Sequence, residues 1–341
     1  MPPAPPAPSQ NLRIAVSAGD PLGIGPEVIV KALADEGLRS QARFLIYGDE
    51  APLLRAADRA GITPFWRSPA HDGPGCSLVE VRALPDDPHA PTPSAPTAAG
   101  GAASFAYLDA AITAAGAGAA DGIVTAPISK EAWHLAGIDF PGHTEVLARR
   151  FEAPRSAMLF VGPTLRVILV TIHVALRDVP RLVTRHRVFD AIDLGAQACR
   201  QLGIASPRVA VAGLNPHAGE GGLFGDEDKR QIAPAVEEAR AAGIDATGPH
   251  PGDAVFLAAA QGKHDLVVAM YHDQGLIPVK LLDRDRAVNV TAGLPIVRTS
   301  PAHGTAFDIA GRNLASPASM AEALRLAVRM ARGKTGKPAS G

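Results

Sequence analysis

The chain has 341 residues, a formal net charge of −1 and an apolar fraction of 47%. One hydrophobic core rarely serves a chain of this length, so two domains are expected. The near-zero charge and the lack of a basic stripe argue against a nucleic-acid partner. No apolar run approaches the ~20 residues of a membrane helix, so we also expect no membrane partner.

The N-terminus and the cysteines indicate where in the cell the protein is located. Residues 1–10, MPPAPPAPSQ, lack the charged and apolar regions of a secretory signal and are typical of a disordered proline-rich tail. Cys76 and Cys199 lie far apart in the sequence and form neither a disulfide framework nor a metal motif. These features favour a reducing, cytoplasmic location.

Short apolar strands alternate with longer, alanine-rich helices. In the first part of the chain, strands are predicted at 12–19, 43–50 and 122–127, helices at 26–37, 52–61 and 104–116, and a loop rich in proline, alanine and glycine at 84–103. Pro26 suits the first turn of its helix, and Gly37 suits the end of that helix.

The second part of the chain repeats the alternation. Strands are predicted at 165–173, 207–217 and 265–272, and helices near 186–202, 228–242 and 317–333. Alternating strands and helices predict an α/β fold with a mainly parallel sheet.

Three of the predicted strands run into a histidine: His173, His217 and His272. Ligands of open α/β folds bind just outside the carboxyl ends of the strands. Three imidazoles there could bind one divalent metal, such as zinc, and leave a position open for substrate or water. A histidine after a strand is more often a hydrogen-bonded loop residue, and the wide spacing is not a local metal motif. The pattern alone leaves both interpretations open.

Other polar residues stand beside apolar segments. In PGHTEVL, His143 and Thr144 could bind a polar substrate, or Thr144 could cap a helix that starts at Glu145. Two cations and an amide further along suit a substrate with carboxylate and phosphate groups, although each could also form ordinary surface salt bridges. These three residues are Lys280, Asn289 and Arg298.

Two glycine-rich segments carry a weaker signal. GDPLGIGPE (19–27) lies between a strand and a helix, where backbone N–H groups could meet an anion. It has neither the G-x-G-x-x-G fingerprint nor a phosphate-loop lysine. We therefore interpret the segment as a tight turn in the first place and as an anion site in the second. In NPHAGEGGLFGDED (215–228), the acids are interpreted as a solvated face or as the start of the next helix.

Several long segments carry a family resemblance. They are GDPLGIGPEV, TAPISKEAWHLAGIDFPGHTEVLA, LNPHAGEGGLFGDED, GPHPGDAVF, YHDQGLIPVK and NVTAGLPIVRTSPAHGTAFDIAG. Together they resemble the 4-hydroxythreonine-4-phosphate dehydrogenase (PdxA) family, which has an isocitrate/isopropylmalate dehydrogenase-like fold. The resemblance covers about residues 11–330. It implies two α/β/α lobes with mainly parallel sheets and an active-site cleft between them. The first lobe would hold residues 11–140 plus 290–335, and the second would hold 141–289.

The resemblance also implies an activity. Family members oxidise 4-phosphooxy-L-threonine to a β-keto acid, which decarboxylates to 3-amino-2-oxopropyl phosphate in vitamin B6 biosynthesis. The implied cofactor is NAD, with NADP possible, and it rests on the resemblance alone. The implied assembly is a homodimer with active sites at the subunit interface.

The resemblance assigns roles to residues already singled out. A divalent metal (zinc, magnesium or cobalt) would be bound by His173, His217 and His272. The substrate would be bound by His143, Thr144, Lys280, Asn289 and Arg298. Asp253 and Asp273 are candidates for orienting a ligand imidazole or relaying the proton.

This chain departs from the family pattern at three positions. Ala302 stands where Asp is common, which bears on the hydrogen bonding around Arg298. Gly252 stands where Ala is common, and Ala175 where Pro is common.

Other functions stay open. A relative within the family could act on D-threonate or D-erythronate 4-phosphate, or on a dihydrodiol carboxylate. The GHTE segment with Lys280 and Arg298 favours a phosphorylated substrate over the dihydrodiol. A three-histidine metal hydrolase would show turnover without NAD. A non-catalytic metal- or nucleotide-binding protein would show no turnover.

Overall fold

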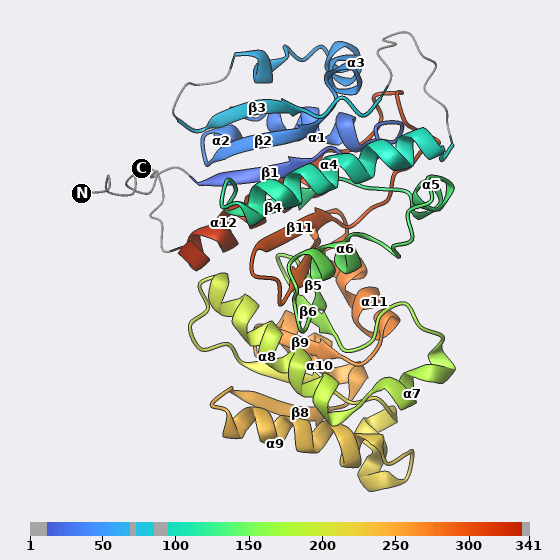
Figure 1. The fold of residues 1–341 in the computed structure, drawn as a ribbon. Coiled ribbons are helices and arrows are strands. Elements are labelled where there is room, and N and C mark those ends of the chain that lie inside the picture. Colours follow the sequence, from blue (N-terminus) through green and yellow to red (C-terminus); the bar gives the residue numbers. More distant parts are fainter. Residues whose placement is uncertain (1–11, 69–72, 85–94, 336–341) are drawn as a thin grey trace, which may run out of the picture. The chain divides into compact units, whose positions relative to one another are not determined.

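The computed structural model describes residues 12–68, 73–84 and 95–335 (Figure 1). The predicted tail at 1–10 lies outside the described residues. The chain divides into two compact units. Unit 1 contains the described residues up to 139, together with 304–317 and 331–335. Unit 2 contains residues 140–303 and 318–330.

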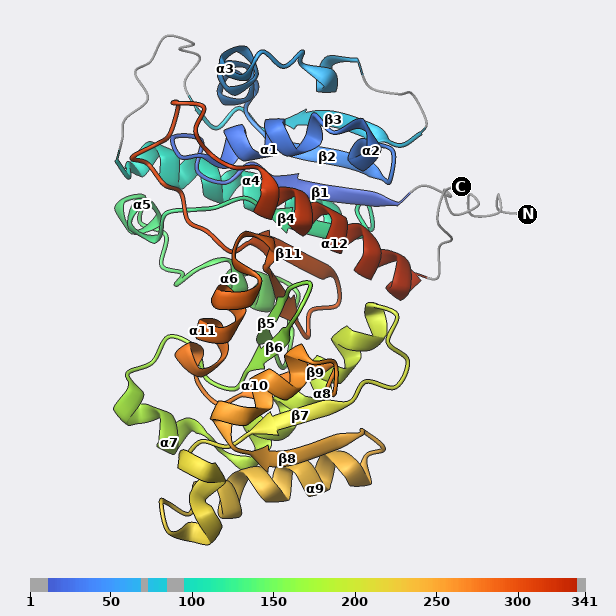
Figure 2. The same ribbon diagram turned by 180° about the vertical axis from the view of Figure 1, so that it is seen from behind.

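Unit 1 is built on a parallel sheet. Its strands are β1 (Arg13–Ser17), β2 (Arg43–Gly48), β3 (Gly75–Glu80) and β4 (Gly122–Thr125), in the order β3-β2-β1-β4. Its helices are α1 (Gly25–Leu33), α2 (Glu36–Arg39), α3 (Glu50–Ala60), α4 (Ala98–Gly116) and α5 (Lys130–Leu135). Helix α4 crosses one face of the sheet in Figure 1, and α1 lies on the opposite face in Figure 2.

Unit 2 combines parallel and antiparallel pairing. Its strands are β5 (Ala157–Val161), β6 (Arg166–Leu169), β7 (Val209–Ala212), β8 (Ala246–His250), β9 (Leu266–Ala269), β10 (Val288–Ala292) and β11 (Val297–Pro301), in the order β11-β10-β5-β6-β9-β7-β8. The pairs from β6 to β8 are parallel, and those from β11 to β6 are antiparallel. The helices are α6 (His143–Arg150), α7 (Val179–Leu182), α8 (Arg185–Gln201), α9 (Ala233–Ala241), α10 (Gly252–Ala260), α11 (His272–Leu282) and α12 (Ala318–Thr335), of which residues 318–330 belong to this unit.

Strand alternation decides which helix covers which face of the unit 2 sheet. Val167 and Leu169 of β6 join a buried cluster with residues of α10 and α11. Successive residues of a strand point to opposite faces, so Ile168 faces the other way. There a Cβ added at Gly195 of α8 would lie 3.2 Å from the Ile168 side chain. Thus α8 covers one face, and α10 and α11 cover the other (Figures 1 and 2).

The sequence predictions of fold class and most elements are confirmed. The α/β class and the mainly parallel strands are both present. The predicted strands correspond to β1, β2, β4, β6, β7 and β9, and the predicted helices to α1, α3, α4, α8, α9 and α12. The sequence analysis did not predict β3, β5, β8, β10 and β11. Polar residues interrupt β3, β8, β10 and β11, whereas β5 is wholly apolar and was missed all the same.

Two boundary predictions are wrong for physical reasons. The helix predicted at 26–37 ends at Leu33, and Gly37 lies inside α2, where the side chain of Asp35 caps the helix by accepting from the Leu38 N–H. Residues 98–103, predicted as loop, belong to α4, which Thr97 caps. A Cβ at Gly101 would lie 2.0 Å from the carbonyl oxygen of Ala132 at α5, so this glycine serves close helix packing rather than a turn.

The two compact units also differ from the predicted lobes. The first lobe was predicted to contain 290–335, whereas 290–303 and 318–330 group with unit 2. The reason is strand pairing: β10 lies between β11 and β5 in antiparallel register. Residues 304–317 do belong to unit 1.

Both cysteines are buried free thiols. Burial raises the pKa of Cys76 to about 12 and that of Cys199 to about 11, so both thiols stay protonated at neutral pH. Among the described helices, none has the length and hydropathy needed to cross a bilayer.

Asp20, just beyond β1, is a fully buried carboxyl. Its Oδ1 accepts a hydrogen bond of 3.0 Å from the Leu22 N–H, which closes the turn before α1. Its Oδ2 is buried with no hydrogen-bond partner within the described parts of the chain. Burial raises the pKa of Asp20 to about 6, because the charged form is poorly solvated there.

Because of this raised pKa, Asp20 lowers the free energy of unfolding as the pH rises. The unfolded carboxyl ionises near 3.8, so folding disfavours the charged form increasingly between pH 3.8 and 6, and fully above 6. We expect Asp20→Asn to raise the free energy of unfolding at pH 8 by up to about 3 kcal/mol, and by much less at pH 4. Urea unfolding at the two pH values measures this, with Asp58→Asn, at an exposed carboxyl of α3, as control. A gain that is the same at both pH values would contradict the assignment.

Candidate functional site

The three strand-end histidines lie beyond three adjacent strands of unit 2. Strands β6, β9 and β7 are neighbours and run parallel, so their carboxyl ends lie at one edge of the sheet. His173 follows β6, His217 follows β7, and His272 follows β9 as the first residue of α11. The structure therefore places all three at the edge where ligands of α/β folds bind.

His173 and His272 come close together. Their ring centroids are 5.5 Å apart, with 41° between the ring planes. The Nδ1 atom of His272 lies 2.7 Å from Oδ1 of Asp273, a contact that orients the ring and leaves Nε2 available. The orienting role of Asp273 toward a metal-bound imidazole stays a prediction.

His217 lies on a left-handed turn after β7. Residues 217–221 all have positive φ, and His217 itself has φ of 53°. Non-glycine residues pay an energetic penalty in this region, so other interactions must hold the turn. Nδ1 of His217 is 3.0 Å from Oε2 of Glu220, and the imidazole is largely exposed.

Asp228 is the buried anchor of this turn. Its side chain is only 2% exposed. Oδ1 accepts from the Leu214 N–H at 2.8 Å, and Oδ2 accepts from the backbone N–H of Asn215 at 3.1 Å and from its side-chain amide at 3.0 Å. The amide of Asn215 also donates to Glu227 at 2.8 Å.

Sequence analysis missed this role of Asp228. The acids of segment 215–228 were interpreted as a solvated face or as a helix start. Asp228 does begin the short helical segment Asp228–Ile232, but its carboxylate is buried, so the solvated-face interpretation is wrong at this position. The signal in the sequence was the glycine at position 213, directly after the strand. The structure shows why a glycine stands there: a Cβ would lie 2.7 Å from Oδ1 of Asp228.

Gln274 connects the ends of β9 and β7. Its Oε1 accepts from the Met270 N–H at 2.6 Å, and its Nε2 donates to the Gly213 carbonyl at 2.7 Å. A Cβ at residue 252 would lie 3.2 Å from this Nε2, so Gly252 leaves more room than the alanine common in the family. The side chain holds the two histidine-bearing strand ends in fixed register.

A pocket of about 620 Å³ lies beside these strand ends. His217, Asp253 and Asp273 line it, so the third histidine and both candidate acids face one space. Apolar side chains of α10 and α11 form another part of its wall, among them Phe256, Ile277 and Leu281. The combination of an apolar wall with a few polar groups is typical of a small-molecule site.

His143 and Thr144 open helix α6, with Gly142 as its N-cap. The alternative that Thr144 caps a helix starting at Glu145 is therefore wrong, because the helix starts two residues earlier. Thr144 instead occupies the first turn. Side chains and backbone N–H groups at a helix start suit an anionic ligand.

Asn289 and Arg298 lie on neighbouring antiparallel strands. Asn289 of β10 pairs with Ser300 of β11, and alternate residues of a strand share a face, so Asn289 and Arg298 lie on the same face. Arg298 is 3% exposed, and its Nη1 donates to Oγ1 of Thr291 at 3.1 Å. At the nearby departure from the family, the Ala302 N–H donates to Oγ of Ser319 at 3.1 Å.

Arg298 remains a cation despite its burial. Burial lowers its pKa to about 10, and the charge of Glu145 in α6 acts in the opposite direction. The guanidinium borders a separate cavity of about 140 Å³ that also touches Gln197 and Gln201. Lys280 is exposed on α11. Neither cation is among the residues that line the 620 Å³ pocket.

The donor set fits a metal only in part. Two imidazoles on one tetrahedral zinc place their ring centroids roughly 5 Å apart, which agrees with the His173–His272 pair. Within residues 12–68, 73–84 and 95–335, however, no three His, Cys, Asp or Glu side chains are grouped closely enough to hold a metal ion. The donor chemistry is suitable for a metal, but the described residues do not bring three donors together.

The anchoring by Asp228 can be tested directly. Asp228→Asn keeps the side-chain shape but replaces one acceptor oxygen by a donor that faces backbone N–H groups. We expect the free energy of unfolding to fall by about 1–3 kcal/mol. Urea unfolding measures this, with the exposed Asp226→Asn as a matched control. Unchanged stability would show that the Asp228 contacts do not hold the turn.

Comparisons with known proteins agree with one another. Residues 40–327 match the family model described as "Pyridoxal phosphate biosynthetic protein PdxA". The chain is 47% identical to a 4-hydroxythreonine-4-phosphate dehydrogenase of Beijerinckia indica, over 93% of this chain and 94% of that protein. It is 44% identical to a D-threonate 4-phosphate dehydrogenase of Cupriavidus necator, over 93% of this chain and 97% of that protein. The crystal structure of a 4-hydroxythreonine-4-phosphate dehydrogenase from Klebsiella pneumoniae superposes with a TM-score of 0.83 at 41% identity, covering 95% of this chain and 99% of that one.

Proposed function

Because the chain belongs to the PdxA family of dehydrogenases, we propose that it oxidises the hydroxyl group of a phosphorylated hydroxy acid, with NAD or NADP as acceptor. The observation that carries this proposal is the position of His173, His217 and His272 beyond three adjacent parallel strands, with His217 lining a 620 Å³ pocket. Such a site can bind a small polar substrate and a metal together.

The first candidate substrate is 4-phosphooxy-L-threonine. Oxidation of its 3-hydroxyl passes a hydride to the nicotinamide and releases a proton, which gives a β-keto acid. Loss of carbon dioxide then gives 3-amino-2-oxopropyl phosphate, in vitamin B6 biosynthesis. The second candidate is D-threonate 4-phosphate, since relatives with either name are similar to the chain at 47% and 44% identity.

The three histidines would hold a divalent metal: zinc, magnesium or cobalt. A bound metal supplies Lewis-acid polarisation of the reacting hydroxyl and carbonyl oxygens. Asp273 fixes the ring of His272 through their 2.7 Å contact. Asp253 lines the same pocket as His217 and is our candidate to receive the hydroxyl proton.

Unit 2 also carries groups suited to the anionic parts of the substrate. His143 and Thr144 stand at the start of α6, where the helix dipole favours a phosphate. Arg298 supplies a buried positive charge on the same strand face as Asn289. Lys280, exposed near the end of α11, supplies a further positive charge.

We further propose that the active form is a homodimer with the site at the subunit interface. Within the described parts of one chain, no three His, Cys, Asp or Glu side chains are grouped closely enough to hold a metal ion. Large apolar side chains are exposed on the two helices that border the pocket: Leu257 of α10, and Ile277 and Leu281 of α11, the last 78% exposed. A second copy over this surface would bury them and bring another imidazole to the site.

The first experiment is an assay of nicotinamide reduction with each candidate substrate and added divalent metal. Preference for 4-phosphooxy-L-threonine would support the vitamin B6 role. Preference for D-threonate 4-phosphate would keep the dehydrogenase and change its pathway. Turnover that needs no nicotinamide would favour the metal hydrolase instead.

Replacing one proposed ligand tests whether the histidines bind a metal that turnover needs. We expect His217→Ala to lose bound metal and at least about 100-fold in turnover, since even indirect partners of a metal cost 10- to 100-fold. Metal analysis and the nicotinamide assay measure both effects. The control is His186→Ala, on an exposed side chain of α8. Full activity in a metal-poor His217→Ala protein would rule out the metal role.

Mixing experiments test whether two subunits share each site. Suppose that each site takes two of its histidines from one chain and the third from the partner chain. A mixed dimer of two inactive variants then has one intact site only if the two mutated histidines are ones that different chains contribute to a site. The 5.5 Å approach of His173 and His272 favours these two as the same-chain pair. We therefore expect activity after mixing His217→Ala with either of the other two alanine variants, and none after mixing His173→Ala with His272→Ala. Silence in all three mixtures would contradict the shared site.

A further inference from the structure

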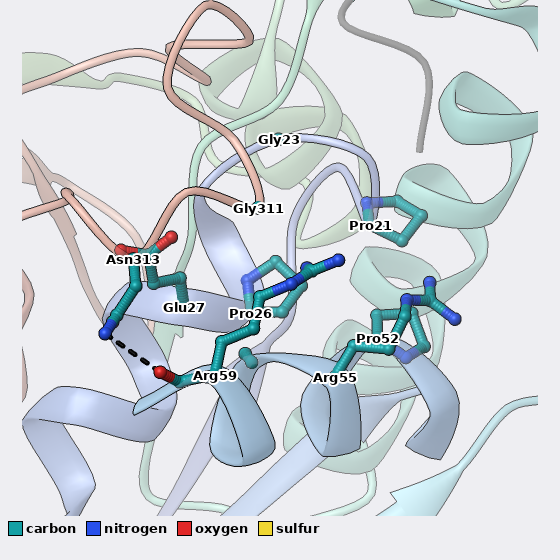
Figure 3. Close-up of a pocket in the computed structure, with 10 residues that line it drawn as sticks. Pro21, Gly23, Pro26, Glu27, Pro52, Arg55, Arg59, Gly311 and Asn313 are labelled. Atoms are coloured by element: carbon teal, nitrogen blue, oxygen red, sulfur yellow. Dashed lines mark hydrogen bonds between the residues drawn. The ribbon is translucent and has the colours of Figure 1, made fainter. Parts of the chain in front are cut away.

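The pockets of the two units differ in size. The pocket of unit 1 lies between the loop before α1, helix α3 and the loop 304–317, where the side-chain amide of Asn313 donates to the Arg59 carbonyl at 3.0 Å (Figure 3). Its volume of about 30 Å³ holds at most a few water molecules, at ~10–15 Å³ each. The unit 2 pocket of about 620 Å³ lies within the range of roughly 300–1,000 Å³ that small-molecule sites occupy. Of these two pockets, the one in unit 2 has room for the proposed substrate.

Gln274 lines the unit 2 pocket, and two hydrogen bonds fix its amide. Oε1 accepts from the Met270 N–H at 2.6 Å, and Nε2 donates to the Gly213 carbonyl at 2.7 Å. The exchanged orientation would turn Oε1 toward a carbonyl oxygen, so the partners permit a single orientation of the amide. A primary amide has two N–H donors, and the second N–H of Nε2 has no hydrogen-bond partner among residues 12–68, 73–84 and 95–335.

The second N–H of Gln274 is accessible from the pocket. Nε2 is 2.7 Å from the carbonyl oxygen of Gly213, and a Cβ at Gly252 would lie 3.2 Å from it. Both glycines line the pocket together with Gln274. Because neither glycine has a side chain, a substrate atom can approach Nε2 closely from the pocket side.

Asn215 is the other primary amide that lines this pocket, and it is already engaged. Its Nδ2 donates to Glu227 at 2.8 Å and to Asp228 at 3.0 Å, which uses both of its N–H groups. Gln274 is therefore the amide of the pocket wall that keeps a donor for a ligand.

The position of this donor identifies the substrate atom that it meets. Gln274 stands two residues after His272, a proposed metal ligand. Gly252, next to Nε2, directly precedes Asp253, the proposed proton acceptor. The reacting hydroxyl oxygen has to meet the metal and the proton acceptor at the same time. It is therefore the substrate atom that comes to lie beside Nε2.

We propose that Gln274 is a catalytic residue whose second N–H donates a hydrogen bond to the reacting oxygen of the substrate. The inference rests on the proposed dehydrogenase function. In the oxidation, the O–H bond breaks and its proton passes to Asp253, while the hydrogen on the same carbon leaves as hydride to the nicotinamide. Negative charge develops on the oxygen as the proton leaves, and a donor already fixed in place stabilises that charge. The same N–H stabilises the keto oxygen when the electrons of the breaking carbon–carboxylate bond move toward it.

Gln274→Met keeps the side-chain length and removes the donor. At saturating metal we expect kcat to fall by roughly 10- to 100-fold, the effect of losing a hydrogen bond to a charged oxygen. The KM for the substrate should change by less than about threefold, because the donor acts on charge that develops after binding. Steady-state kinetics measure both values, and calorimetry on the full chain measures metal affinity. The control, Gln261→Met, changes an exposed glutamine at the end of α10 and should keep the kcat of the unmodified chain.

Gln274→Glu is the second variant, and it decides the question if the methionine variant does not fold. Its carboxylate can still accept from the Met270 N–H, but it has no N–H and its charge opposes the charge on the reacting oxygen. We therefore expect kcat to fall further than in Gln274→Met. Unchanged kcat in both variants would overturn the inference. A kcat that saturating metal restores fully would overturn it as well, since Gln274 would then only position the metal ligands.

Assays of the unmodified chain separate this inference from the proposed function. Turnover by the unmodified chain, together with unchanged kcat in the variants, would overturn only the role of Gln274. Absence of turnover by the unmodified chain with all candidate substrates and both nicotinamide cofactors would overturn the proposed function, and the role of Gln274 with it.

Discussion

The close approach of α11 to the sheet is the constraint on which the candidate site in unit 2 depends. Gly275 makes it possible, because a Cβ there would lie 2.7 Å from the Leu169 side chain and 2.9 Å from Val167. The preceding residue, Gln274, then reaches both Met270 and Gly213, so the helix start is tied to β9 and β7 together. His272, two residues earlier, has little freedom left. Packing of a glycine thus determines where an imidazole points.

The β7 side is held in a different way. There the backbone adopts a left-handed turn that costs energy, and a buried carboxylate supplies three hydrogen bonds that offset the cost. Asp228 accepts all three of these hydrogen bonds from Leu214 and Asn215 at the strand end, so its negative charge is stabilised where the turn begins. The turn leaves the His217 ring exposed, as a ligand completed by a second chain would require.

Sequence reasoning could find the histidines because parallel strands bring their carboxyl ends to one edge, whatever the loops do. It could not find Asp228, since a buried and a solvated aspartate look alike in the run GDED. A glycine caused another error: Gly101 was counted toward a loop, although it lies in α4 and allows this helix to pack against α5. The antiparallel pairing of β10 with β5 involves residues more than a hundred positions apart, and local periodicity holds no information about such a partner.

The two units carry complementary chemistry. Unit 2 offers imidazoles and carboxylates, which suit a metal and proton transfer, whereas the pocket of unit 1 offers guanidinium groups between proline walls. Two acids near that pocket are engaged locally: Glu27 is paired with Lys31 at 2.8 Å, and Asp20 accepts from the Leu22 N–H at 3.0 Å. Asp20 closes the turn before α1 by accepting from the Leu22 N–H, so a hydrogen bond between a buried carboxyl and the backbone fixes the shape of this loop.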